Sequence, residues 1–162
     1  MRFDVKMFCN QTYSFDFCMQ SIGRDQRIAT ARGFRDVLII AVSQNQKQVT
    51  NATTTINKIR PKFSGPYGKK RLGLCETKFK EVSGVLQKTL ESAKTGCRLS
   101  LKEAQKVPRT CIDAMDDCKN TWTLPFNGPD QSNPLAESCF NVMGLSYITS
   151  LALRKLLHNR AG

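Results

Sequence analysis

Helical spacing of apolar residues over most of the chain is the feature that most constrains its fold. Between Gln26 and Arg60, apolar or small residues recur every three or four positions, and Pro61 ends the pattern. The spacing predicts one long amphipathic helix, or two nearly collinear ones, with Gly33 as a weak point. Its expected inner face comprises Ile28, Ala31, Phe34, Leu38, Ala41, Asn45, Val49, Ala52, Ile56 and Ile59.

Residues 60–73, RPKFSGPYGKKRLG, are dense in glycine, proline and charge and predict a loop. A second helix is expected from Leu74 to about Ala93, with Gly96 as its C-terminal cap. Its inner face comprises Cys75, Phe79, Val82, Leu86, Leu90 and Ala93.

A third helix is expected after Ser100, which forms a capping-box pattern with Glu103. Pro108 lies inside this pattern and predicts a kink rather than a break. Its inner face comprises Leu101, Ala104, Val107, Cys111, Ala114 or Met115, and Cys118.

The last helix should run from about Pro134 to Leu157, after a long connection that carries the only tryptophan, Trp122. Its inner face comprises Leu135, Cys139, Val142, Leu145, Ile148, Ala152 and Leu156.

Strand signals are nearly absent, and four long helices joined mostly by short loops predict an all-α fold, an antiparallel up-and-down four-helix bundle. We expect a single domain over residues 1–162, with residues 1–25 as an N-terminal piece and residues 26–160 as the bundle. A chain of 162 residues can bury such a core. No apolar run approaches the roughly 18 residues of a membrane span.

The chain has seven cysteines: Cys9, Cys18, Cys75, Cys97, Cys111, Cys118 and Cys139. None forms a C-x-x-C pair and the only histidine is His158, so we expect no metal site and no cofactor. Disulfides in an oxidising compartment explain the cysteines better, with buried reduced thiols in a cytosolic protein as the alternative. Because seven is odd, at least one thiol is free or pairs with another chain.

Two N-glycosylation patterns, at Asn10 and Asn51, also favour a secreted protein. The opening MRFDVKMF lacks the apolar core and cleavage site of a signal peptide. We therefore expect Met1 to be an artificial start, or a start that has lost its leader.

The formal net charge is +12, and eight Lys or Arg fall between Lys58 and Lys80 against one acid, Glu76. Such a field favours an acidic partner: nucleic acid, an anionic membrane, an anionic polysaccharide or an acidic protein. For nucleic acid, the interleaved Phe63, Tyr67 and Phe79 could supply base stacking.

An enzyme is not expected. His158 lies close to the C-terminus, which is a poor place for a buried general base. One helix turn cannot direct Asp113, Asp116 and Asp117 into one pocket. No glycine-rich phosphate loop follows a strand.

Four segments together resemble the plant invertase inhibitor and pectin methylesterase inhibitor family: YSFDFCMQSIGRD (13–25), LGLCETKFKEVSGVL (72–86), RTCIDAMDD (109–117) and NVMGLSYITSLALRKLL (141–157). The resemblance implies a four-helix bundle preceded by a disulfide-stapled helical hairpin. It also implies the pairs Cys9–Cys18 and Cys75–Cys111. Cys118 and Cys139 could then meet across the bundle, which leaves Cys97 as the odd thiol.

The function that the resemblance implies is inhibition of a plant carbohydrate-active enzyme, without chemistry by the inhibitor. A one-to-one complex would cover the enzyme's substrate cleft, in the apoplast or the vacuole. Both enzyme classes use acidic catalytic residues, and arginine can pair with carboxylates in a bidentate manner. We therefore expect Arg98, Arg109 and Thr110 to contact the target.

The identity of the target stays close to balanced. Invertase inhibitors are known for a Pro-Lys-Phe tripeptide in the loop between the second and third bundle helices, where this chain has TGCRLS (95–100). Its own Pro61-Lys62-Phe63 follows the first long helix instead and is interpreted as a helix stop. The Thr110-Cys111 pair with Asp113 slightly favours pectin methylesterase over acid invertase. A non-inhibitory basic module that binds pectin or nucleic acid is the remaining alternative.

Overall fold

The computed structural model describes residues 2–123 and 128–159. All regular structure in these ranges is helical, which confirms the predicted all-α class. Four long helices form a bundle: α3 (Phe34–Ile59), α4 (Pro66–Thr95), α6 (Val107–Asn120) and α7 (Ala136–Asn159). The shorter elements are α1 (Val5–Cys9), α2 (Phe15–Cys18), the π-helical turn η1 (Met19–Gly23), the 3-10 helices η2 (Gln26–Thr30) and η3 (Arg60–Phe63), and α5 (Arg98–Ala104).

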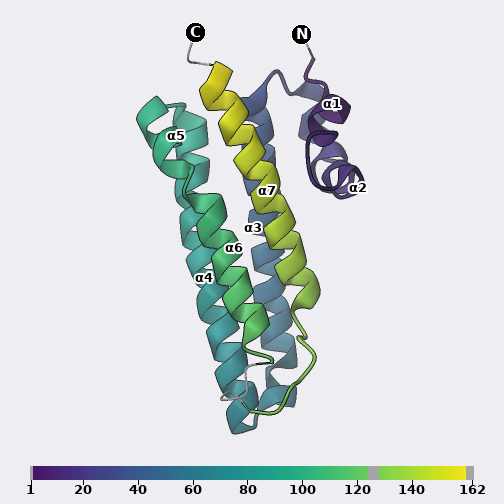
Figure 1. Cartoon of the computed structure of the whole chain (residues 1–162), viewed down its shortest axis with the longest axis vertical. Helices are drawn as coiled ribbons and strands as arrows, with labels where there is room; N and C mark the ends of the chain where they lie inside the picture. The colour runs from purple at the N-terminus through teal and green to yellow at the C-terminus, as the bar shows by residue number, and fades with distance from the viewer. Residues whose placement is uncertain (1, 124–127, 160–162) are drawn as a thin grey trace.

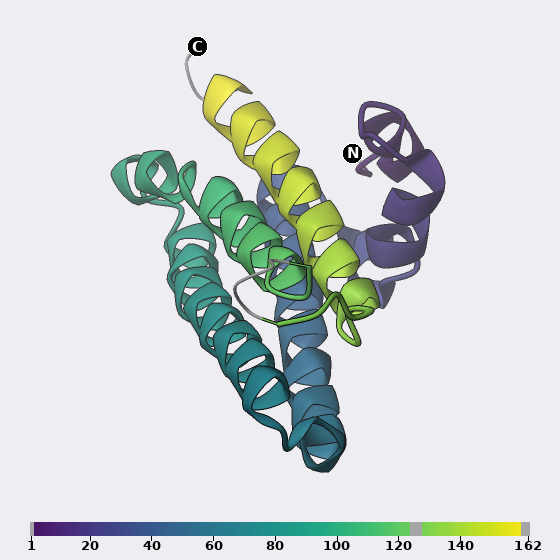
Figure 2. The ribbon, with the colours of Figure 1, turned by 60° about the horizontal axis from the view of Figure 1, so that its bottom comes forward.

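The four long helices pack as a closed ring. Helix α3 contacts α4 and α7, and α6 contacts the same two helices from the other side. Figure 1 shows that successive long helices run in opposite directions and that both termini lie at the end that carries α5. In Figure 2, the N-terminal hairpin and α5 lie on opposite sides of α7. We call the end with α5 the α5 end, and the end with η3 the η3 end.

The helix faces that the spacing predicts are the faces that the bundle buries. Every residue of the four expected inner faces is buried or half-buried, and most of them belong to one continuous core. Asn45 is the polar member of this set, and its side-chain amide donates to the Ser146 hydroxyl on α7 at 3.2 Å. Burial of apolar side chains on one stripe of each helix is therefore what assembles the ring.

Two helix starts differ from the prediction. Helix α3 begins at Phe34 and not at Gln26, because the chain is extended at Ala31 and Gly33. Residues 26–30 of the predicted helix form the separate 3-10 helix η2. Helix α4 begins at Pro66, so most of the predicted loop 60–73 is helical. Proline suits the first turn of a helix, because its missing N–H would have no partner there. Pro66 therefore starts α4 eight residues earlier than predicted.

The predicted third helix is two helices. Helix α5 ends at Ala104 and α6 starts at Val107, so the kink expected at Pro108 is a break. The ring of a proline clashes with the carbonyl of the residue four positions earlier, which here is Ala104. The Ser100 cap was also wrong, because Cys97 is the N-cap of α5 and Ser100 lies inside the helix.

The N-terminal hairpin is stapled as the resemblance implied. Cys9 and Cys18 form a disulfide with a Cα–Cα distance of 5.5 Å, and both are fully buried. Phe3 and Phe8 pack against Phe34 with ring centroids 5.6 and 6.2 Å away. The hairpin is therefore tied to the first turn of α3 by aromatic contacts.

The second disulfide corrects two predicted pairings. Cys75 is bonded to Cys118, not to Cys111, and Cys118 is therefore not bonded to Cys139. Cys111 precedes Cys118 by seven residues, which places it about 10 Å further along α6. That displacement exceeds the roughly 7 Å between Cα atoms that a disulfide can span. Cys97, Cys111 and Cys139 are free thiols, of which only Cys97 is exposed.

Candidate target-binding surface

The three residues predicted to contact a target lie at one end of the bundle. Arg98 begins α5, and Arg109 and Thr110 lie in the first turns of α6. These two helices follow each other at the α5 end in Figure 1. The break before α6 places the three residues on two separate short segments, and their role in binding remains a prediction.

Arg109 and Thr110 present different groups to solvent. The Arg109 Nε lies 3.1 Å from Asp113 Oδ1 in an ion pair, and the two side chains are 80% and 58% exposed. An exposed pair of this kind stabilises a protein by less than about 1 kcal/mol, so a partner carboxylate can compete for the guanidinium. Thr110 is half-buried, and its hydroxyl donates to the Lys106 carbonyl at 3.2 Å.

Arg98 also lines a basic hollow of about 680 Å³ between α5, the C-terminal turns of α7 and the hairpin. Its other lining residues are Gln11, Gln105, Leu151, Arg154, Lys155, Leu157 and His158. No Asp or Glu is among them, so the hollow gathers positive charge around two leucines and two amides. Such a site favours carboxylates or another compact anion. We name it the α5-end hollow.

The sequence-based prediction missed Arg154 and Lys155, which belong to this hollow. The signal was an adjacent Arg-Lys pair that interrupts the apolar end of the last helix, but no spacing rule joins it to Arg98. His158, expected as a solvated tail residue, is exposed in the last turn of α7 and faces the same hollow.

A polar seam holds α4 and α6 in register below this end. Lys78 Nζ lies 3.1 Å from Asp117 Oδ2 and 3.6 Å from Glu81 Oε2. The hydrogen bond with Asp117 is the main cause that raises the pKa of Lys78 above its usual value. Together with the nearby Cys75–Cys118 bond, the seam fixes the helix that carries Arg109 and Thr110. These links tie the C-terminal half of α6 to α4.

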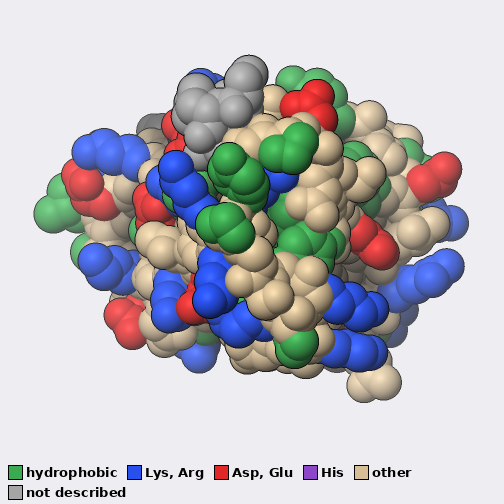
Figure 3. Space-filling model, turned by 90° about the horizontal axis from the view of Figure 1, so that it is seen from below, with side chains coloured by type: hydrophobic (Ala, Val, Ile, Leu, Met, Phe, Trp, Pro, Cys, Tyr) green, Lys and Arg blue, Asp and Glu red, His purple; other side chains and the backbone are tan. Residues whose placement is uncertain are grey.

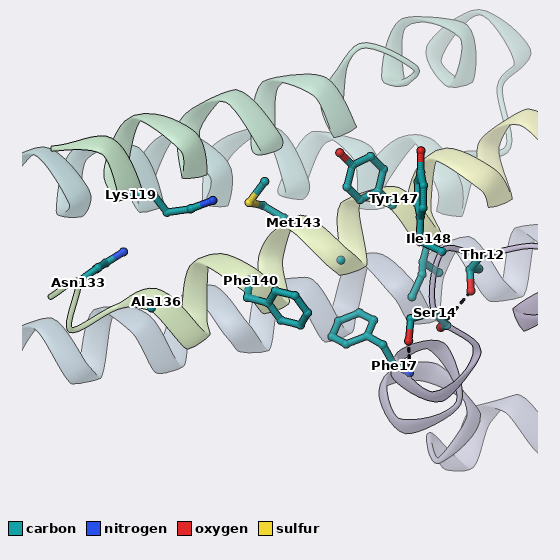
Figure 4. Close-up of a pocket in the computed structure, with 12 residues that line it drawn as sticks. Thr12, Ser14, Phe17, Lys119, Asn133, Ala136, Phe140, Met143, Tyr147 and Ile148 are labelled. Atoms are coloured by element: carbon teal, nitrogen blue, oxygen red, sulfur yellow. Dashed lines mark hydrogen bonds between the residues drawn. The ribbon is translucent and has the colours of Figure 1, made fainter. Parts of the chain in front are cut away.

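An apolar groove of about 650 Å³ runs between the hairpin and α7 (Figure 4). Tyr13 packs on Tyr147 with centroids 5.2 Å apart, and Phe17 packs on Phe140 at 5.7 Å. Lys119 lies at the other end of the groove. The sequence-based prediction missed this groove, because Phe140 and Tyr147 are outside the core face of α7. It can accommodate an apolar side chain or ring.

The described residues show no arrangement for metal chemistry or for crossing a membrane. In residues 2–123 and 128–159, no three His, Cys, Asp or Glu side chains are placed to hold a metal ion. None of the helices described is long and apolar enough to cross a membrane. Asn10 and Asn51 are both exposed, and glycosylation at either remains a prediction.

Comparison with known proteins agrees with this architecture. Residues 4–153 match the family model of the plant invertase/pectin methylesterase inhibitors. The chain is 36% identical over 155 residues to Pectinesterase inhibitor 5 of Arabidopsis thaliana, which covers 95% of this chain and 83% of that protein. The crystal structure of a pectin methylesterase inhibitor from Arabidopsis thaliana has the same fold, with a TM-score of 0.62 and 15% identity over 94% of this chain and 95% of that one. The chain is therefore a member of the plant invertase/pectin methylesterase inhibitor family.

Proposed function

We propose that this protein inhibits a plant pectin methylesterase by binding it one-to-one and covering its substrate cleft. The 36% identity to a protein named as a pectinesterase inhibitor, over 95% of the chain, carries the choice of target. The inhibitor itself performs no chemistry, and it acts as a secreted protein in the apoplast, with the vacuole as an alternative site. Acid invertase is the alternative target.

The α5 end supplies the contact surface in this proposal. Arg98, Arg109 and the cations of the α5-end hollow offer donors to the acidic side chains of an enzyme cleft. Because Arg109 and Thr110 lie on a helix that a disulfide ties to α4, their backbone loses little freedom on binding and the entropic cost is low. Pro61-Lys62-Phe63 lies at the η3 end, so the proposed contact does not use it.

A paired inhibition titration tests the proposal. Oxidised, monomeric protein is added to a plant pectin methylesterase and to a plant acid invertase at mildly acidic pH and moderate salt. We expect stoichiometric loss of esterase activity and no loss of invertase activity. Loss of invertase activity alone would assign the other target, and two unaffected enzymes would remove the inhibitory function.

The variant Arg109→Ala with Thr110→Ala tests the surface. We expect the inhibition constant to rise about tenfold or more, as for residues at the centre of an interface, with unchanged helix content by circular dichroism. The matched control is Lys47→Ala with Thr54→Ala, which removes a cation and a hydroxyl from exposed positions of α3. Full potency of the first variant would place Arg109 and Thr110 outside the interface.

A further inference from the structure

The η3 end carries a concentration of cations that the proposed inhibition does not use. Lys58, Lys62, Lys69 and Lys70 are exposed, and none has a side-chain ion pair with a described residue. Arg60 is paired with Glu76, the one acid of this stretch. Figure 3 views the molecule from this end and shows Lys and Arg side chains gathered over the lower half of the face. The positive electrostatic potential of these cations favours the binding of an anion at the η3 end.

Within this surface lies a second hollow, of about 580 Å³, which we name the η3-end hollow. It combines an apolar floor, two amide or hydroxyl groups and two cations on its rim. The floor is Pro61, Phe63 and Leu72, the neutral polar groups belong to Asn57 and Ser64, and the cations are Arg60 and Lys69. Its volume falls in the range of small-ligand sites, about 300–1,000 Å³.

The floor of this hollow is held in place from behind. The Phe63 ring packs edge-on against the buried Trp122 ring, with centroids 5.5 Å apart. Arg71, which is also buried, donates to the Pro129 carbonyl at 2.7 Å and lies 5.8 Å from the Trp122 ring centre. Packing on Trp122 therefore holds Phe63 at its place in the floor.

We propose that the η3-end hollow binds a de-esterified uronate oligosaccharide. A sugar acid presents a carboxylate, several hydroxyls and an apolar ring face, and the hollow offers a counterpart to each. Lys69 pairs with a carboxylate, while Arg60 stays paired with Glu76 and adds positive charge to the rim. Asn57 and Ser64 bond hydroxyls, and the sugar ring faces Phe63. The neighbouring Lys58, Lys62 and Lys70 contact further carboxylates along the same chain.

The choice of a polyuronate rests on the proposed function, because de-esterified pectin is what a pectin methylesterase produces. Nucleic acid fits less well, since stacking of successive bases needs several exposed rings and Tyr67 is the one largely exposed ring of residues 57–72. The η3 end lies opposite the α5 end in Figure 1, so the polysaccharide and the enzyme can be bound together. Binding would hold the inhibitor where the product of its target accumulates.

The test is a calorimetric titration of the whole oxidised protein with oligogalacturonate and with its methyl-esterified form of the same length. We expect the acid form to bind and the ester to bind at least about tenfold more weakly, since the ester has no carboxylate for Lys69 to pair with. Lys62→Gln with Lys69→Gln should weaken binding of the acid form about tenfold, while esterase inhibition stays unchanged. Asn57→Ala with Ser64→Ala should weaken it severalfold without changing the net charge.

The matched control is Lys47→Gln with Lys88→Gln, which removes two exposed charges far from the η3 end. Equal weakening by the control would overturn the proposal, because binding would then follow net charge alone. Equal affinity for a single-stranded DNA of the same charge would overturn it in favour of a general polyanion surface. The titration contains no enzyme, so failure of inhibition leaves its result intact, and absence of oligogalacturonate binding alone refutes the η3-end site.

Discussion

The free thiol of Cys139 lies 3.6 Å from the Sγ of Cys118, which is itself bonded to Cys75. Three buried sulfurs on α4, α6 and α7 thus form one group. Cys118 can be bonded to Cys75 or to Cys139, but not to both at once. Burial raises the pKa of Cys139 to about 11, so the attacking thiolate is scarce at neutral pH. The observed pairing is therefore protected while the pH is low.

We expect alkaline pH to move the disulfide within this group. The Cys139 thiolate attacks Cys118 Sγ, the Cys118–Cys139 bond forms, and Cys75 leaves as a thiolate that takes up a proton, with no external oxidant. Below pH 11 each pH unit raises the thiolate population about tenfold. Non-reducing peptide mapping should find the Cys118–Cys139 peptide after incubation at about pH 9 but not at about pH 5, and Cys139→Ser should abolish it. Its absence at pH 9 would show that exchange is blocked.

The three free thiols should differ sharply in reactivity. Cys97 is exposed, and hydrogen bonds from Ser100 lower its pKa. Burial raises the pKa of Cys111 to about 12. Brief iodoacetamide treatment of the native protein at neutral pH should therefore label Cys97 alone, with Cys111 and Cys139 labelled only after denaturation. Mass spectrometry of the digested protein measures this, and early labelling of Cys111 would contradict its burial.

Asp25 should make folding stability depend on acid pH. Hydrogen bonds from Arg27 hold the pKa of Asp25 well below its usual range, and Gln44 Nε2 donates to the same carboxylate at 2.6 Å. Because the folded-state pKa is depressed, this stability is full above the unfolded pKa of about 4 and is lost as the pH falls below it.

Asp25→Asn should therefore lower the free energy of unfolding by about 1–3 kcal/mol at pH 7, and by less at pH 2. Urea denaturation at both pH values measures the difference. Asp113→Asn, which removes the exposed partner of Arg109, is the control and should change stability by less than about 1 kcal/mol. A difference for Asp25→Asn that does not shrink at pH 2 would exclude its ionisation as the cause.

Phe63 should matter for stability more than for inhibition. Its ring packs on Trp122, the only tryptophan, so Phe63→Ala opens a space beside a buried indole. We expect a loss of about 1–3 kcal/mol and red-shifted Trp122 fluorescence, with esterase inhibition retained. Leu99→Ala removes a side chain that is 71% exposed and should leave the emission unchanged. Lost inhibition with intact stability would instead make Pro61-Lys62-Phe63 part of the interface.

Gly144 should be required for the packing of the hairpin on α7. A Cβ at this position would lie 2.5 Å from Cε1 of Phe17, closer than two non-bonded carbon atoms can approach. Gly144→Ala should displace the Phe17 ring and destabilise the protein by about 1–3 kcal/mol. The control Gly84→Ala, at a helical position with nothing within 4 Å of its Cβ, should stabilise by up to about 1 kcal/mol. Thermal unfolding compares them, and equal stabilisation would contradict the close contact.

The sequence was sufficient for the features that depend on local structure. The three-to-four spacing identified the buried faces of all four long helices, because a helix of 3.6 residues per turn places those residues on one stripe. Gly96 was predicted as the cap of α4 and has the left-handed conformation, with φ of 68°, that glycine adopts easily. The short Cys9–Cys18 loop was also predicted correctly, from the family resemblance.

The tertiary structure alone decided what depends on alignment between helices. Cys111 and Cys118 lie on nearly the same stripe of α6, so spacing cannot choose between them, and the register of α4 against α6 makes Cys118 the partner of Cys75. Arg98 and Lys155 are far apart in sequence and meet only because α5 folds beside the end of α7. Local spacing encodes which face of a helix is buried, whereas the level at which two helices meet follows from the packing of the whole core.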